Sequence, residues 1–166
     1  SASSTLYEGL GPFSFHNPKN ALSASAHSRV NTPSYPVALW LQLQGVAQVV
    51  AAVRKGASGT AALDLVSREL RPGVQALVFH VWRNMGRAQA LRKQLAPKAP
   101  PALIDALLCT ALALAWNRDT LAYDAHTLVN QTVEAAKRSA PLARHAPFLN
   151  ACLRRFLREQ DHWVRQ

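Results

Sequence analysis

The sequence lacks the residue patterns on which most active sites and metal sites depend. Its six histidines never stand four residues apart, and it contains neither a Cys-x-x-Cys pair nor an HExxH motif. The nearest approach to a phosphate loop, Gly56-Ala57-Ser58-Gly59, has no strand pattern before it and no lysine after it. No nucleophile beside a base and no contrasting pair of carboxylates is recognisable. We therefore expect no catalytic residue, no metal and no cofactor within this chain.

Long apolar runs are also missing. The longest, residues 103–116, is interrupted by Asp105 and is too short to cross a bilayer. The first residues do not show the basic-then-apolar pattern of a signal peptide. We therefore expect a cytoplasmic protein without a membrane partner. Because Met85 is the only methionine, residue 1 is not expected to be a translation start, and the chain is expected to be a fragment or a processed product.

Cysteine is scarce, which leaves little scope for disulfide stabilisation. Cys109 and Cys152 are the only two, and both fall within apolar helical patterns. Buried, reduced cysteines in a reducing compartment are the favoured interpretation. A disulfide between the two remains open as the alternative. A chain of 166 residues is long enough to form one ordinary hydrophobic core without a disulfide or a metal.

Acidic residues are few, and basic residues are abundant. The chain has 19 Lys and Arg against 9 Asp and Glu, a formal net charge of +10. Such a surplus favours a polyanionic partner, of which RNA and DNA are the most common. The alternative is that the surplus reflects a GC-rich genome and solvated helix faces. One region carries only Glu69 against a group of seven basic residues: Arg68, Arg71, Arg83, Arg87, Arg92, Lys93 and Lys98.

The spacing of apolar residues predicts helices from Val37 onward and no strand of any length. Residues 1–36 are rich in Ser, Ala and Asn, are interrupted by prolines, and are expected to form an irregular arm or to be a tag remnant. We expect one domain over 37–166. Its expected helices are 37–54, 58–66 with Ser58 as N-cap, 72–84 with Pro72 in the first turn, one after a joint at Gly86, 102–116 at the centre, 124–137 with Asp124 as N-cap, and one from about 148.

The last two expected helices carry a family resemblance. The segments HTLVNQTVEAAK, residues 126–137, and FLNACLRRFLRE, residues 148–159, resemble those that close NusB-like domains. These are helical RNA-binding modules that occur alone as antitermination factors or fused to RNA methyltransferases. The Leu153-Arg154-Arg155 segment is most similar to the N-terminal domain of the Fmu/Sun ribosomal RNA cytosine-C5 methyltransferases. The resemblance implies an all-α bundle of about six to seven helices.

The resemblance also implies what would lie outside this chain. A cytosine-C5 methyltransferase of this kind uses a thiolate and a separate domain that holds S-adenosylmethionine. Neither Cys109 nor Cys152 stands in the Pro-Cys or Thr-Cys context of the family's catalytic cysteines. The sequence also departs from the family in having Tyr35-Pro36-Val37-Ala38 where arginines open the first helix, and His80 where a glycine is usual. The chain is therefore expected to be an N-terminal fragment that presents ribosomal RNA to a catalytic domain.

Seven basic residues are the candidate RNA-binding site. Arg83 and Arg87 are four residues apart, as are Arg154 and Arg158, so each pair can meet successive phosphates along a strand. The full set is Arg83, Arg87, Arg92, Lys93, Arg154, Arg155 and Arg158. Asn84 and Gln89 are candidates for contacts that add local preference.

Other polar and aromatic residues are less decisive. Trp82 and Trp163 are the candidate stacking platforms for unpaired bases, with Trp82 favoured as a core residue. Asn130 and Asn150 are expected to pack or cap helices. The functional alternative to RNA presentation is a free-standing NusB-like antitermination factor, or a protein-interaction module whose helical face binds a protein.

Overall fold

The fold is an all-α bundle. The computed structural model describes residues 37–116 and 124–160, and within them it shows seven α-helices, two short 3-10 helices and no strand, which confirms the expected class and helix number. The expected arm at 1–36 lies outside the described residues. The elements are α4 (Leu39–Arg54), α5 (Gly59–Leu63), η1 (Arg68–Leu70), α6 (Arg71–Arg83), α7 (Met85–Leu95), α8 (Ala102–Trp116), α9 (Ala125–Lys137), η3 (Ala143–His145) and α10 (Ala146–Arg158).

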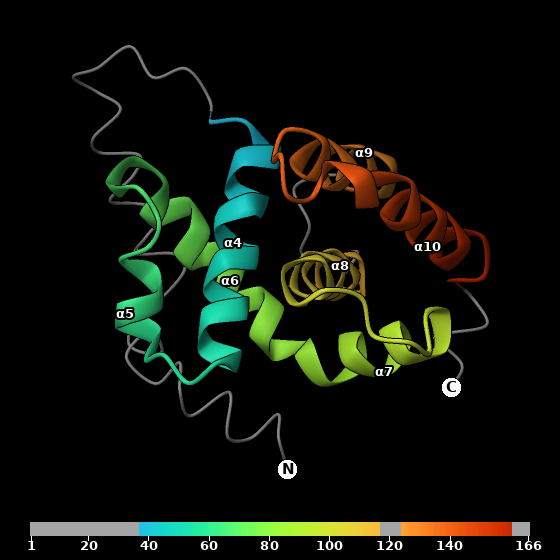
Figure 1. The fold of residues 1–166 in the computed structure, drawn as a ribbon, viewed down its shortest axis with the longest axis horizontal. Coiled ribbons are helices and arrows are strands. Elements are labelled where there is room, and N and C mark those ends of the chain that lie inside the picture. Colours follow the sequence, from blue (N-terminus) through green and yellow to red (C-terminus); the bar gives the residue numbers. More distant parts are fainter. Residues whose placement is uncertain (1–36, 117–123, 161–166) are drawn as a thin grey trace.

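Helix α8 lies at the centre of the bundle, as its sequence predicted. It contacts α4, α6, α7, α9 and α10, and Figure 1 shows it end-on with α4, α7 and the α9–α10 pair around it. Its apolar residues extend around nearly the whole helix, which suits a position covered on all sides. Burying each large side chain, such as Leu107, Leu108 or Leu112, contributes roughly 1.5–3 kcal/mol. No helix in the described ranges has the length and apolarity needed to cross a membrane.

Helix α4 forms one wall of this core. Its apolar residues Leu43, Val46 and Val50 are buried, and the helix ends before Gly56, whose φ of 106° suits only a glycine. Gly45 allows α6 to approach α4 closely. A Cβ at Gly45 would lie 2.8 Å from Val74 Cγ2, so any larger residue would force α4 and α6 apart.

Helix α5 is shorter than the sequence predicted. Ser58 caps it as expected, because its Oγ accepts a hydrogen bond from the Ala61 amide at 3.1 Å. The helix ends at Leu63, and the chain tightens into turns that still bury Val66. Arg71 stabilises this turn, since its Nε donates to the Val66 carbonyl at 3.0 Å.

The joint between α6 and α7 lies at Asn84, two residues before the expected joint at Gly86. Pro72 stands in the first turn of α6 as predicted. The helix ends because the Asn84 side chain donates to the His80 carbonyl at 3.3 Å and its backbone leaves the helical region. Gly86 is therefore within the first turn of α7.

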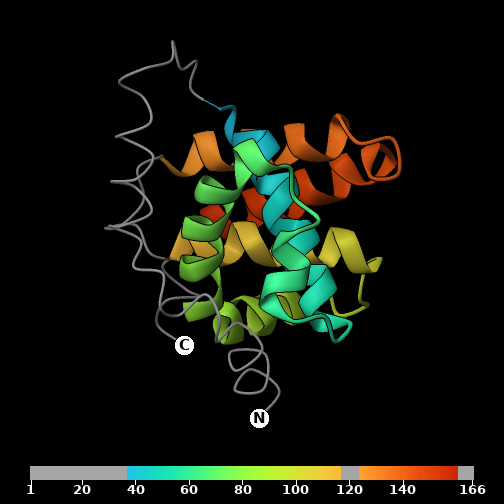
Figure 2. The ribbon, with the colours of Figure 1, turned by 90° about the vertical axis from the view of Figure 1, so that its left-hand side faces the viewer.

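The last two helices form an antiparallel pair, whose opposite directions are visible in Figure 2. Asp124 caps α9, because its Oδ1 accepts a hydrogen bond from the Thr127 amide at 2.7 Å. The apolar stripe of α10 is buried and consists of Leu149, Cys152, Leu153 and Phe156. Pro147 stands inside the first turn of α10, where a missing N–H costs nothing. Residues 117–123, between α8 and α9, lie outside the described part of the chain.

Candidate nucleic-acid interface

Arg83 and Arg87 lie on either side of the α6–α7 joint rather than on one helix. Arg83 is the last residue of α6, and Arg87 is in the first turn of α7. Both side chains are exposed. The Arg83 guanidinium carbon lies 5.7 Å from the centre of the Phe79 ring, and that of Arg87 lies 5.2 Å from the Trp116 ring. Both distances are within the range of cation–π attraction.

Lys93 lies on the outer side of α7. It is exposed together with Arg87, Ala90 and Gln94, which recur at spacings of three and four residues and so mark the solvent face of this helix. The opposite side of α7 buries Met85, Ala88, Leu91 and Leu95 against the core. Helix α7 therefore presents two basic residues outward along its length.

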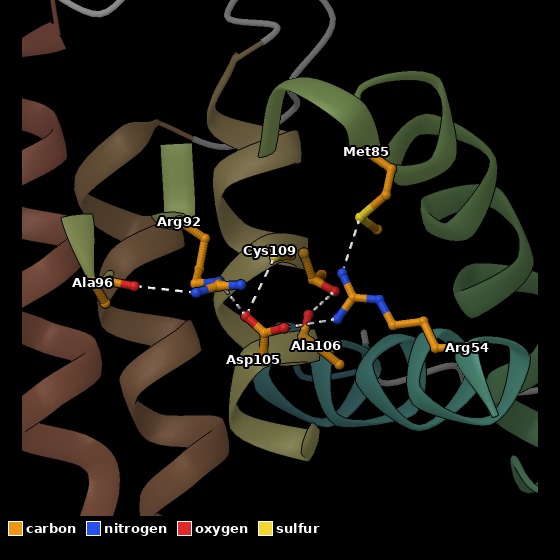
Figure 3. Close-up of polar contacts among 8 residues, drawn as sticks. Arg54, Met85, Arg92, Ala96, Asp105, Ala106 and Cys109 are labelled. Atoms are coloured by element: carbon orange, nitrogen blue, oxygen red, sulfur yellow. Dashed lines mark hydrogen bonds and ion pairs between the residues drawn. The ribbon is translucent and has the colours of Figure 1, made fainter. Parts of the chain in front are cut away.

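Arg92, by contrast, is placed in the interior. Its side chain is 10% exposed, its Nε lies 2.9 Å from Asp105 Oδ1, and its Nη1 donates to the Ala96 carbonyl at 3.1 Å. Figure 3 shows this guanidinium directed at Asp105 on α8. The structure does not bring Arg92 together with the exposed candidates, because a buried guanidinium cannot reach a phosphate at the surface.

Asp105 receives a second arginine from the other side. Arg54 Nη1 of α4 lies 3.2 Å from Asp105 Oδ2, and Arg54 Nη2 lies 3.4 Å from Met85 Sδ. Figure 3 shows Asp105 between the two guanidinium groups. The carboxylate thus links three helices, α4, α7 and α8, at a largely buried position. An ion pair of this kind adds little to stability compared with apolar packing, but removing one partner is costly because it leaves a charge buried alone.

Helix α10 presents the second group of exposed candidates. Arg154 and Arg158 are exposed and one turn apart. Arg154 Nε donates to Asn150 Oδ1 at 2.9 Å, so Asn150, which was expected to pack or cap, instead holds a surface arginine. Arg155 is half-exposed and pairs with Glu159 at 3.2 Å. Helices α7 and α10 contact each other, and their C-terminal ends lie on the same side of the molecule in Figure 1.

The acidic residues nearby have other partners. Asp105 pairs with Arg54 and Arg92, Glu134 with Arg138 at 2.6 Å, and Asp64 with Arg71 at 3.9 Å. Within residues 37–116 and 124–160, ten exposed cations form no ion pair, and five of them lie on α6, α7 and α10: Arg83, Arg87, Lys93, Arg154 and Arg158. The other five are Lys55, Arg68, Lys98, Lys137 and Arg144. We call the five residues on α6, α7 and α10 the open cations. Their charge is available to a ligand.

Of the two aromatic candidates, only Trp82 lies among the described residues. Trp82 is 6% exposed and belongs to the core, which confirms the favoured interpretation, while Trp163 lies outside the described residues. Phe79 and Trp116 are the rings that lie beside open cations. The spacing of four between Phe79 and Arg83 could have revealed the first pair. The second joins residues far apart in sequence and could not be predicted without the fold.

The polar candidates for local preference are only partly accessible. Asn84 is buried and donates to the His80 carbonyl, whereas Gln89 is half-buried on α7. His80 is half-buried, and burial together with the nearby Arg83 lowers the pKa of its imidazole. The imidazole is therefore neutral near pH 7 and adds no charge to this part of the surface.

The cysteines are both free and buried, so the disulfide alternative is not what the structure shows. Burial and the adjacent Asp105 carboxylate raise the pKa of the Cys109 thiol from 9.0 to about 11, and the thiol lies 3.7 Å from Asp105 Oδ1. Burial also raises the pKa of Cys152. A thiol with a raised pKa is a poor nucleophile at neutral pH. Among the described residues, no group of three His, Cys, Asp or Glu side chains could hold a metal ion.

Asp105 is the important residue whose role the sequence reasoning missed. Its signal was present, since it is the only charged residue in the helix at 102–116 and a buried charge needs a partner.

Comparison of the chain with protein-family models, with curated proteins and with solved structures finds no match.

Proposed function

We propose that this chain is an RNA-binding domain that uses the open cations of the α6–α7 joint, α7 and α10 to hold the phosphate backbone. The observation that carries the proposal is the division of charge. The acidic side chains near the core and on α9 have arginine partners, and the five open cations of α6, α7 and α10 have no acidic partner in the described part of the chain. A surface of this kind attracts a polyanion.

The affinity in this proposal comes mainly from counterion release. Each phosphate neutralised by Lys or Arg releases condensed cations from the nucleic acid, so binding weakens steeply as salt rises. Arg154 and Arg158 stand one turn apart on α10, a spacing that suits neighbouring phosphates. Arg155 can contribute to the same face by exchanging Glu159 for a phosphate, although its existing ion pair makes this contribution smaller.

The surface favours RNA over a protein partner. In the described residues only two large apolar side chains are exposed, Val37 at 41% and Leu65 at 62%. They belong to different segments, before α4 and after α5. A helical face that docks a protein needs a contiguous apolar patch, whereas a phosphate backbone needs exposed cations.

The finer proposal is a NusB-like domain that presents ribosomal RNA to the catalytic domain of a cytosine-C5 methyltransferase in the cytoplasm. Its support is the resemblance of residues 126–137 and 148–159 to the closing helices of that family, joined to a helical bundle of suitable size. S-adenosylmethionine and the nucleophilic thiolate would then belong to the catalytic domain. A blot of cell lysate for the native protein tests this step. A band large enough for a second domain supports it, and a band near 18.1 kDa rejects it.

The RNA-binding proposal is tested by charge reversal on α10. Arg154→Glu combined with Arg158→Glu should lower the affinity for single-stranded and duplex RNA by about tenfold or more, with a shallower salt dependence. Lys137→Glu with Arg144→Glu is the matched control, since both residues are exposed and lie elsewhere, at the end of α9 and in the connection to α10. Equal affinity losses in the two double variants would show that only net charge matters and would reject the α10 site.

A further inference from the structure

The α6–α7 joint carries two arginine–aromatic pairs within a short stretch of chain. Arg83 lies over Phe79 of its own helix, and Arg87 of α7 lies over Trp116 at the end of α8. The rings are half-buried, whereas the two arginines are exposed. Figure 2 shows α6 and the end of α8 on the same side of the molecule. Each guanidinium carbon thus lies over a ring while the arginine that carries it is exposed to solvent.

A third arginine–aromatic pair shows what is distinctive about the joint. Arg138 lies 4.6 Å from the Trp40 ring centre, but its Nε also pairs with Glu134 at 2.6 Å. That guanidinium is already occupied by a carboxylate, and it stabilises the packing of α9 beside α4. Arg83 and Arg87 have no such carboxylate in the described residues. No carboxylate of the described residues therefore competes with a ligand for either guanidinium.

A flat guanidinium held by a ring is a platform for another flat group. Unpaired nucleobases stack on arginine planes as well as on aromatic rings, while paired bases are already stacked inside a duplex. A lysine at the same position would keep the charge but not the plane. Holding the guanidinium on a ring beforehand also reduces the conformational freedom lost when a base arrives.

We propose that the α6–α7 joint is a stacking site for an unpaired RNA base, which lies on the outer face of the Arg87 guanidinium above Trp116, with Arg83 beside it as a second platform. The inference rests on the proposed RNA binding and deepens it. Lys93 and the arginines of α10 hold phosphates of any RNA, and the joint distinguishes unpaired from paired segments. Phosphate contacts alone do not make this distinction.

The test uses the full chain and substitutions that preserve charge. Arg87→Lys combined with Arg83→Lys is compared with wild type for binding to a fluorescein-labelled oligoadenylate of about 12 nucleotides and to an RNA duplex of the same length. Arg138→Lys is the control, because it removes an arginine from a ring at a site already occupied by Glu134. Circular dichroism and thermal unfolding of each variant confirm that the fold is unchanged.

The expected result is a loss of about fivefold or more in affinity for oligoadenylate, with duplex affinity and the salt dependence unchanged. The control should bind both RNAs as wild type does. Unchanged oligoadenylate affinity in the double variant, or equal losses for both RNAs, would overturn the stacking site and leave the proposed function standing. Absence of RNA binding by the wild-type chain at low salt would overturn both.

Discussion

The two sides of α7 show arginine used in opposite ways. On the inner side Arg92 is buried, paired with Asp105 and bonded to a carbonyl, so it joins α7 to α8. On the outer side Arg87 and Lys93 are exposed and form no ion pair with the described residues. Two adjacent residues, Arg92 and Lys93, thus have unrelated roles. Only exposed basic residues can contact a polyanionic partner, so buried ones such as Arg92 must be left out when the net charge is used to infer a partner.

The inner side also explains how the outer side is positioned. The packing of α7 against α8 buries Leu91 and Leu95, and the Asp105 cluster adds a directional contact to this apolar interface. Arg54 extends the contact to α4. The exposed cations therefore stand on a helix that is fixed to the core at its first turn by Met85 and near its end by Arg92. We predict that substitutions on the inner side of α7 and in the Asp105 cluster change the stability of the fold, and that substitutions on the outer side change RNA binding.

The largest effect is expected from Asp105→Asn. The substitution keeps the side-chain shape but leaves the guanidinium groups of Arg54 and Arg92 largely buried without a counter-charge. The free energy of unfolding should fall by about 3 kcal/mol. Urea denaturation followed by circular dichroism measures the change. Asp64→Asn is the control, because its pair with Arg71 is at 3.9 Å and 69% exposed on the Asp64 side, so a change below about 1 kcal/mol is expected.

The free energy of unfolding should also depend on pH through Cys109, which lies beside Asp105 in the same cluster. Burial and Asp105 hold the pKa of Cys109 at about 11, above its ordinary 9.0. Below pH 9.0 the thiol is protonated in both states. Above it, the unfolded chain ionises first, so the cysteine's contribution to stability is lost as the pH rises toward 11, to an extent of roughly 2–3 kcal/mol.

The measurement is urea denaturation between pH 8.5 and 10.5 on wild type and Cys109→Ala. Lysines and tyrosines titrate in this range in both proteins, so the difference between the two curves isolates the cysteine. The wild-type protein should lose stability more steeply than the variant. Parallel curves would mean that the thiol ionises as easily in the folded chain as in the unfolded one, and the described burial would be wrong.

Much of this fold followed from local sequence. The apolar spacing of α4, α8 and α10 and the caps at Ser58 and Asp124 depend on residues close together in the chain, and the structure confirms them. The inner role of Arg92 did not follow, because its partner lies on another helix. The same holds for Arg87 above Trp116. A charge surplus predicts that cations face solvent, but only the packing of α7 on α8 decides which ones do.

On the outer side, removing charge should change binding and leave stability alone. Arg87→Gln with Lys93→Gln removes two open cations from the solvent face of α7. The slope of log affinity against log salt for RNA should decrease by about 2, while the free energy of unfolding changes by less than about 0.5 kcal/mol. Lys55→Gln with Lys137→Gln removes the same charge from the ends of α4 and α9. A similar decrease in that control would show that RNA does not bind preferentially at the solvent face of α7.

The smallest effect concerns the backbone of the outer side. Gly86 is exposed in the first turn of α7, and a Cβ there would have nothing within 4 Å. Gly86→Ala should therefore raise the free energy of unfolding by about 0.5 kcal/mol, through better helix propensity and a less flexible unfolded chain. Gly45→Ala is the counterpart on the inner side, where Val74 Cγ2 would be 2.8 Å away, and it should destabilise. Stabilisation by both substitutions would show that α4 and α6 are less closely packed than the structure describes. Opposite signs would confirm that the space around each glycine, and not only helix propensity, decides the effect of adding a methyl group.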